Sequence, residues 1–141
     1  MRRTNGGLSR RDHDCIESVH SLSSNGWPAR VKDVAAKMKV TPPTAVGFLD
    51  KLVARALVEK GPSGYRLSDE GSAWLKDATR AHRLLETLLA RTGMSLEEAC
   101  RIASSVGGDL DSDAVEKLCA HLSHPDACPH GRPIPEGDKY D

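Results

Sequence analysis

Apolar residues recur at every third or fourth position over residues 9–53, which is the period of helices that bury one face. The first run, over residues 9–24, ends at the breaker sequence Ser23-Ser24-Asn25-Gly26. A second run covers residues 31–38. Thr41-Pro42-Pro43 then favours a tight turn and a new helix, because proline fits the first turn of a helix but not its interior. The pattern predicts three short helices with a capped turn before the third.

The spacing then changes to a strand pattern. Residues 57–60 and 65–67 flank the turn sequence Gly61-Pro62-Ser63-Gly64, which predicts a β-hairpin. Helix, turn, helix and hairpin in this order make a winged helix-turn-helix, an arrangement that binds DNA. By itself, the hairpin is also compatible with a role in closing the core. We therefore expect a winged helix-turn-helix domain over residues 1–70, with residues 1–8 as a mobile arm.

A long amphipathic helix follows, from Ser68 to about Arg91. Its apolar stripe consists of Trp74, Leu75, Ala78, Ala81, Leu85, Leu88 and Leu89. The stripe is longer than a small DNA-reading domain covers, so we expect it to pack against a second copy of the chain. Two shorter helices and a Pro/Gly-rich irregular tail complete a mainly α fold, in which residues 71–141 form a helical dimerisation domain.

Double-stranded DNA would meet the outward face of the third helix and the basic residues of the hairpin, or wing. The predicted DNA-binding residues are Thr41, Pro43, Thr44, Val46, Gly47, Lys51, Lys60 and Arg66. Lys60 and Arg66 would contact phosphates, which positions the protein without reading sequence. Val46 and Gly47 offer no polar readout, which leaves apolar contact with thymine methyl groups for Val46.

Composition adds a charge asymmetry that the net charge of zero hides. Residues 1–66 carry 12 Lys/Arg against 6 Asp/Glu, and residues 67–141 carry 8 against 14. The basic half suits phosphates and the acidic half suits a cation, although two ordinary solvated surfaces explain the same difference. No apolar run has the length of a membrane span and no apolar signal segment opens the chain. We expect a cytoplasmic protein with no membrane partner, whose four cysteines are thiols or metal ligands.

Five segments carry a resemblance to a known family. They are LSDEG after the hairpin, AHRLLETLL in the long helix, EEACR in the next helix, SDAVEKL in the last helix and HPDACPHGRPIP in the tail. With the winged helix-turn-helix before them, residues 9–135 resemble the metal-dependent repressors of the diphtheria-toxin-repressor and manganese-transport-regulator type, in the short form without a C-terminal β-domain. The resemblance implies a homodimer that binds a divalent cation and then operator DNA, and so represses metal-uptake genes.

The resemblance also implies metal ligands, matched position by position. Asp14 and Glu17 match two carboxylate ligands of the first helix, and His82 matches a histidine ligand of the long helix. Glu86 matches a carboxylate of the metal region, and Cys100 a position that is Cys in iron-type and Glu in manganese-type members. We expect Mn(II) or Fe(II), and the same donors accept Zn(II) or Co(II). Without the resemblance, Asp14 and Glu17 are typical of a solvated helix edge. His82 and Glu86 are equally common as a surface pair, but their position inside an otherwise apolar helix favours ligation.

The sequence departs from the family pattern after Cys100. The family has Glu-His a few residues further on, and this chain has Arg101-Ile102-Ala103-Ser104 there. Two expected ligands are therefore missing. Asp109 or Asp111, in the residues that precede SDAVEKL, is a candidate substitute.

The tail concentrates further metal-binding side chains. Its thiol and imidazole donors are Cys119, His121, His124, Cys128 and His130. By spacing alone they suggest a second metal site, for zinc. We favour a packed cap on the last helix, and the second metal site stays open as the alternative. An iron–sulfur cluster built from the four cysteines lacks the close cysteine spacing that such clusters use.

We predict a metal-responsive, DNA-binding transcriptional regulator. No Ser/His/Asp order, phosphate loop or pair of catalytic acids indicates an enzyme. Two alternatives stay open. One is a metal-independent or redox-sensing winged-helix regulator that has lost part of the metal site, and the other, of a different class, is a metal-binding or protein-interaction module with weak DNA affinity.

Overall fold

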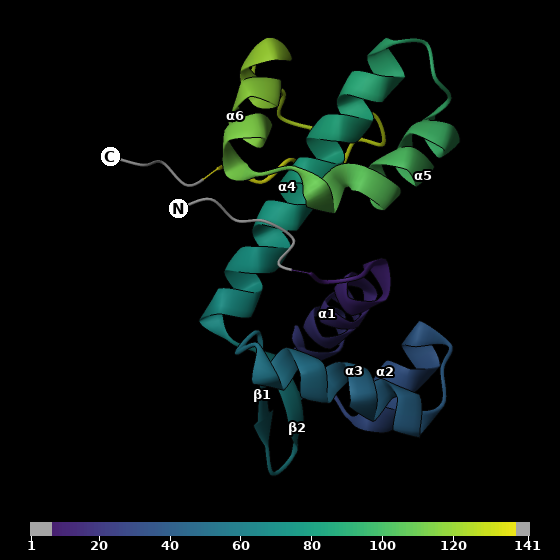
Figure 1. Ribbon diagram of the computed structural model, residues 1–141, viewed down its shortest axis with the longest axis vertical. Helices are drawn as coiled ribbons and strands as arrows, with labels where there is room; N and C mark the ends of the chain where they lie inside the picture. The colour runs from purple at the N-terminus through teal and green to yellow at the C-terminus, as the bar shows by residue number, and fades with distance from the viewer. Residues whose placement is uncertain (1–6, 138–141) are drawn as a thin grey trace. The chain divides into compact units, whose positions relative to one another are not determined.

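The computed structural model describes residues 7–137, and its elements are shown in Figure 1. It divides into two compact units, residues 8–75 and the residues that follow Leu75. The elements are α1 (Arg10–Ser23), α2 (Val31–Met38), α3 (Pro42–Ala54), β1 (Val58–Gly61), β2 (Gly64–Leu67), α4 (Asp69–Arg91), α5 (Leu96–Val106), the 3-10 helix η1 (Gly107–Asp109) and α6 (Ser112–His121). The predicted fold class, a mainly α chain with a two-stranded wing after a helix-turn-helix, is confirmed. No described helix is long and apolar enough to cross a membrane.

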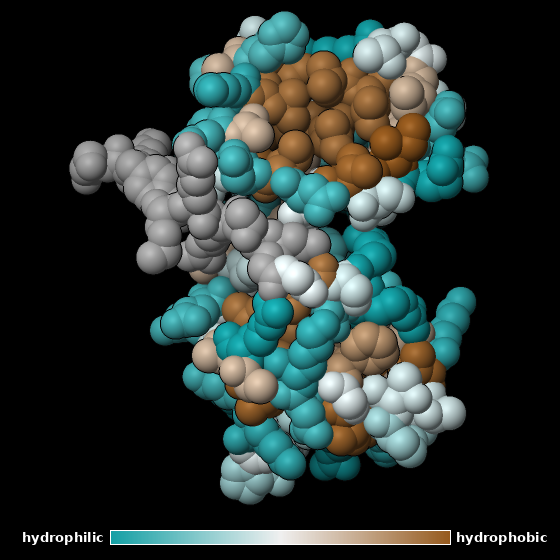
Figure 2. All heavy atoms as spheres, viewed as in Figure 1, coloured by the Kyte–Doolittle hydropathy of each residue, from teal (hydrophilic) through white to brown (hydrophobic). Residues whose placement is uncertain are grey.

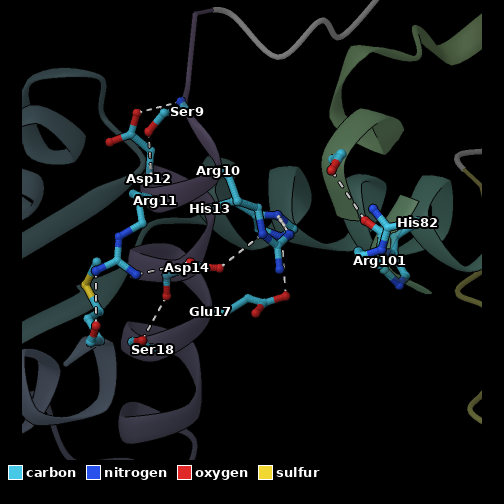
Figure 3. Close-up of polar contacts among 12 residues, drawn as sticks. Ser9, Arg10, Arg11, Asp12, His13, Asp14, Glu17, Ser18, His82 and Arg101 are labelled. Atoms are coloured by element: carbon cyan, nitrogen blue, oxygen red, sulfur yellow. Dashed lines mark hydrogen bonds and ion pairs between the residues drawn. The ribbon is translucent and has the colours of Figure 1, made fainter. Parts of the chain in front are cut away.

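Helix α1 begins with a reciprocal cap that also buries a carboxylate. The Ser9 backbone N–H donates to Asp12 Oδ2 at 2.8 Å, and the Asp12 N–H donates to Ser9 Oγ at 3.1 Å (Figure 3). Asp12 is 1% exposed, and Lys51 Nζ of α3 lies 2.6 Å from its Oδ2. Burial alone would raise the pKa of Asp12, but the bonds from Lys51 and Ser9 outweigh it and hold the pKa below its usual range.

The turn between α2 and α3 follows from local chemistry. Lys39 closes α2 in the left-handed conformation, and its N–H donates to the last carbonyls of that helix. The Thr41 side chain accepts from the Thr44 N–H, while Pro42 and Pro43 occupy the first turn of α3, where no donor is lost. The two helices bury one face each against α1. These buried residues are Val34, Ala35, Met38, Ala45, Leu49 and Leu52.

The wing is a hairpin that is also tied to the core. β1 and β2 pair antiparallel from Val58↔Leu67 to Gly61↔Gly64. Tyr65 is 4% exposed and exchanges two backbone hydrogen bonds with Ala29, at 2.7 and 2.8 Å. Gly64 has a φ of +140°, and a side chain there would collide with the Ala29 carbonyl, so the position requires glycine. The hairpin therefore both closes the core and projects a turn.

The LSDEG segment, residues 67–71, connects the wing to α4. Ser68 Oγ donates to the Ala56 carbonyl at 2.6 Å and accepts from the Gly71 N–H at 2.9 Å. A β-carbon on Gly71 would collide with the Leu57 carbonyl, so the first turn of α4 approaches the hairpin backbone as only glycine allows. This segment fixes where α4 starts.

The second unit has a small core of its own. Its buried apolar residues, on α4, on α6 and directly after α6, are Ala81, Leu84, Val115, Cys119 and Leu122. The tail adds no helix or strand over its described residues, but it folds back on itself. The Ile134 N–H donates to the Asp126 carbonyl at 2.9 Å, and Arg83 of α4 donates to the Pro133 carbonyl. The irregular tail is thus an ordered turn that packs on α4.

One prediction at the N-terminus is wrong in part. The mobile arm expected over residues 1–8 lies outside the described residues except for Gly7 and Leu8. Leu8 is 4% exposed and belongs to the core of the winged helix. Its burial follows from the Ser9 cap, which fixes the chain direction directly before α1.

We expect Asp12→Asn to destabilise the winged-helix unit by about 2 kcal/mol. The neutral amide forms no ion pair with Lys51, and its hydrogen bond from the Ser9 N–H lacks the negative charge of the carboxylate. The measurement is urea unfolding followed by tryptophan fluorescence. Both tryptophans, Trp27 and Trp74, lie in residues 8–75, so the signal reports this unit. The exposed Asp50 of α3 gives the control, since Asp50→Asn should change stability by no more than about 0.5 kcal/mol. Equal effects of the two substitutions would contradict the assignment.

Candidate functional site

The strongest candidate site is on α4 and α5. His82 and Glu86 lie one helical turn apart, so their side chains share a face of α4. His82 Nε2 is 3.0 Å from Glu86 Oε2, and Cys100 Sγ of α5 is 3.8 Å from the same nitrogen. Glu86 is 2% exposed, although a carboxylate is rarely buried unless it is paired. One ligand atom from each residue lies within 4.8 Å of the others, which is a spacing that one metal ion can span.

Glu86 has a second set of partners from the tail. His130 Nδ1 is 2.6 Å from Glu86 Oε1, which is the oxygen that does not face His82. Glu86, Cys128 and His130 form another group whose donor atoms lie within 4.8 Å of one another. The two groups share only Glu86. The sequence thus places a buried carboxylate between an imidazole of α4 and an imidazole of the tail.

The surroundings of Glu86 and Cys100 shift the pKa values of these two groups in opposite directions. Burial alone would raise the pKa of Glu86, but the hydrogen bonds and charges of His130 and His82 outweigh it and hold the pKa below its usual range. Burial and the neighbouring Glu86 charge raise the pKa of the Cys100 thiol. The carboxylate is therefore a ready ligand, whereas the thiol must lose a proton to bind a cation.

Asp14 and Glu17 lie on α1, in the winged-helix unit. Asp14 pairs with Arg10 at 3.4 Å and with Arg11 at 3.6 Å, and Glu17 Oε1 lies 3.3 Å from His13 Nε2 (Figure 3). Their described partners are thus basic side chains of their own helix. Their role as metal ligands stays a prediction that rests on the sequence.

The remaining candidate donors fall outside the two donor groups that contain Glu86. Asp111 Oδ1 accepts the Ala114 N–H at 2.8 Å as the cap of α6, and Asp109 is exposed in η1. Cys119 Sγ lies 3.4 Å from His124 Nδ1, and His121 is exposed in the last turn of α6. Among the described residues, the donor groups that could hold a metal contain none of these five.

The candidate DNA-reading face is the exposed side of α3. Thr41, Pro43, Thr44 and Gly47 are exposed, and Val46 is half-buried. Thr41 Oγ1 donates to Thr44 Oγ1 at 2.9 Å, so the cap occupies part of the hydrogen-bonding capacity of both hydroxyls. This face offers short side chains and little charge.

The basic residues predicted to bind DNA differ in how readily their charged groups could contact phosphate. The Lys51 ammonium pairs with buried Asp12, so a DNA contact from it competes with a structural ion pair. Arg66 is exposed on β2, and Lys60 on β1 lies over the Tyr65 ring, 5.9 Å from its centroid. The wing therefore carries the cations most open to phosphate contact.

The sequence analysis did not predict that His130 of the tail contacts Glu86. The available signal was the Cys-Pro-His-Gly segment at residues 128–131, because proline and glycine favour a tight turn and a turn brings nearby donors together. It also missed Asp12, whose signal was the spacing Ser9-x-x-Asp12 of a reciprocal cap.

The chain is similar to known regulators. Residues 68–136 match the family model described as the iron dependent repressor, metal binding and dimerisation domain. An uncharacterized HTH-type transcriptional regulator of Aeropyrum pernix is 30% identical over 135 residues, which cover 92% of this chain and 73% of that protein. The transcriptional regulator MntR of Escherichia coli O6:H1 is 28% identical over 104 residues, which cover 73% of this chain and 67% of MntR.

Solved structures agree with these relatives. The manganese regulator SloR superimposes with a TM-score of 0.77 at 28% identity, covering 94% of this chain. The match covers 62% of SloR, so this chain spans less than two thirds of that protein. The similarity therefore includes both the winged helix and the helices that carry His82, Glu86 and Cys100.

We expect His82→Ala to weaken Co(II) binding at least about tenfold, because it removes one imidazole from a small ligand set. The measurement is titration of the reduced protein with Co(II) by visible absorption. His121→Ala is the matched control, since His121 is exposed and outside both donor groups, and it should leave the affinity unchanged. Unaltered affinity in the His82 variant would remove His82 from the site.

Proposed function

Because the chain belongs to the diphtheria-toxin-repressor and manganese-transport-regulator family of metal-dependent transcriptional regulators, we propose that it represses metal-uptake genes when it binds a divalent metal ion. Members of this family are not enzymes. The observation that carries the proposal is the buried carboxylate of Glu86 with His82 Nε2 at 3.0 Å and Cys100 beside them. A cation bound by these three side chains would replace their mutual hydrogen bonds with stronger ligand bonds.

Of the two metals expected from the sequence, the donor set favours Fe(II). Mn(II) prefers carboxylate, carbonyl and water oxygens, whereas a thiolate with an imidazole suits Fe(II), Co(II) and Zn(II). Cys100 supplies that thiolate, at 3.8 Å from His82 Nε2. Asp14 and Glu17 remain predicted ligands on sequence grounds, and the same metal titrations of Asp14→Ala and Glu17→Ala test them.

The proposed output is operator DNA binding by α3 and the wing. A metal ion changes DNA affinity only if it binds more tightly to the arrangement of the chain that fits DNA, and it then shifts the population toward that arrangement. The short side chains of Thr44 and Val46 support apolar and hydroxyl contacts with base edges, and Lys60 and Arg66 support phosphate contacts. We place this activity in the cytoplasm, where the DNA and the reduced thiols are.

We also propose that the functional form is a homodimer joined through the helices of the second unit. Figure 2 shows a broad apolar face over the region of α4, α5 and α6. Leu96 and Val106, at the two ends of α5, are 42% and 43% exposed, so this helix presents two large apolar side chains to solvent. The family model that matches residues 68–136 is described as a dimerisation domain, which supports this surface as the contact.

For metal activation, we expect Fe(II) or Co(II) to raise DNA affinity at least about tenfold over the chelated protein, since coupling between ligand sites commonly amounts to 1–3 kcal/mol. The probe is a fluorescent duplex selected from a random pool by the metal-loaded protein, and the measurement is anisotropy at one fixed salt concentration, under anaerobic conditions. Glu86→Gln should lose this metal response, whereas Glu97→Gln, on an exposed side chain of α5, should keep it. Equal affinity with chelator and with every metal would exclude a metal-responsive regulator.

For dimerisation, we expect the double substitution Leu96→Glu and Val106→Glu to convert the dimer to a folded monomer, because two buried charges at a contact between copies go unpaired. Light scattering on a sizing column measures the mass. Trp27→Glu is the control, because Trp27 is 74% exposed but lies in the winged-helix unit, and it should leave the mass unchanged. A dimer that survives the α5 substitutions would place the contact elsewhere.

A further inference from the structure

Two arginines occupy the first turn of α1, where the helix dipole disfavours positive charge. Ser9 caps the helix, so Arg10 and Arg11 are its first two residues, at the end where negative charge is stabilising. Both pair with Asp14, but an acidic residue that follows its basic partner along a helix is the weaker order for such a pair. Helix stability therefore does not account for two adjacent cations at this position.

The ion pairs of Asp14 are open to solvent (Figure 3). Arg10 Nε lies 3.4 Å from Asp14 Oδ1, and Arg11 Nη1 lies 3.6 Å from Asp14 Oδ2. The arginine side chains are 45% and 48% exposed, and pairs of this kind are weak in water. The Lys51 pair differs, because its partner Asp12 is 1% exposed. A phosphate group can therefore displace Asp14 from both arginines far more easily than it can draw Lys51 away.

Arg11 lies beside the helix-turn-helix. Its Nη2 donates to the Met38 carbonyl at 3.1 Å, at the last residue of α2 and directly before the turn that leads into α3. The next residue, Asp12, contacts Lys51 of α3 at 2.6 Å. The first turn of α1 is thus tied to both helices within the same compact unit. Its cations adjoin the helix that is proposed to bind DNA.

We propose that Arg10 and Arg11 form a second phosphate-binding patch for double-stranded DNA, which Asp14 restrains by competing for their guanidinium groups. The patch adds to the cations of the wing and rests on the DNA binding proposed above. Guanidinium groups bind phosphate oxygens through paired N–H donors, and such contacts position a protein without reading base sequence. The patch therefore raises the affinity for any duplex, and the carboxylate of Asp14 lowers it.

The salt dependence of DNA binding tests the patch. The probe is a fluorescent duplex of scrambled sequence, and anisotropy is measured over a series of salt concentrations with a chelator present. We expect Arg10→Gln with Arg11→Gln to weaken binding at least about tenfold and to lower the slope of log affinity against log salt by about two, because two phosphate contacts are lost. Lys76→Gln with Lys117→Gln removes the same charge from exposed positions of the second unit and should keep the slope.

Urea unfolding separates this role from a structural one. The double arginine variant should unfold at the same or a higher urea concentration than the wild type, because it removes cations from the positive end of α1. If that variant does not fold, Arg10→Gln alone replaces it, since this substitution leaves the Arg11 bond to Met38 in place. The slope should then fall by about one.

The restraint by Asp14 has its own variant. Asp14→Asn should tighten binding to the same duplex at least about threefold, because the neutral amide forms no ion pair with either arginine. In a protein that already carries Arg10→Gln and Arg11→Gln, the gain should disappear, since its cause is the pairing between these residues. An equal gain in both proteins would reflect only the general loss of negative charge, and it would overturn the restraint.

The outcomes separate the patch from the proposed regulator. An unchanged salt slope in the arginine variant would overturn the patch, whether or not metal ions alter DNA affinity. A reduced slope supports the patch, and if every metal then leaves the affinity for the selected duplex unchanged, only the regulator is excluded. If the wild-type protein binds neither duplex at the lowest salt concentration, the patch and the regulator are both overturned.

Discussion

A buried negative charge organises the second unit of this protein. A carboxylate removed from water is strongly unfavourable unless charged or polar partners replace the lost hydration. Glu86 is 2% exposed, and its partners come from two places, His82 on its own helix and His130 on the tail. The tail contacts α4 through this carboxylate, which is one of five side chains gathered there whose donor atoms could hold a metal ion.

Much of the winged helix could be predicted because its signals act over a few residues. Thr41-Pro42-Pro43 fixes the start of α3 through a cap and a missing N–H, and both effects depend only on the adjacent turn. The hairpin follows in the same way from Gly61-Pro62-Ser63-Gly64. The long helix was expected from Ser68 to about Arg91, and α4 spans Asp69–Arg91, since its apolar period continues without a breaker.

Contacts between distant residues could not be predicted in this way. His130 and Glu86 are 44 positions apart, and Lys51 and Asp12 are 39 apart, so no local preference links them. The tail shows why spacing in the sequence does not predict such contacts. Its five donors lie close in sequence, yet Cys119 pairs with His124 beside α6 whereas Cys128 and His130 meet α4. Which of them converge is decided by how the chain folds back after α6, and spacing carries no information about that.

The close backbone contact at Gly71, where the wing leads into α4, determines what the motif LSDEG can indicate about a sequence. Ser68 holds the end of the hairpin, and Gly71 passes the Leu57 carbonyl too closely for any side chain. These constraints belong to the geometry of a strand that leads directly into a helix, and they are the same whether or not the chain ever binds a metal. The segment LSDEG is therefore a signature of architecture. The capacity to sense an ion has to be judged from the side chains around Glu86.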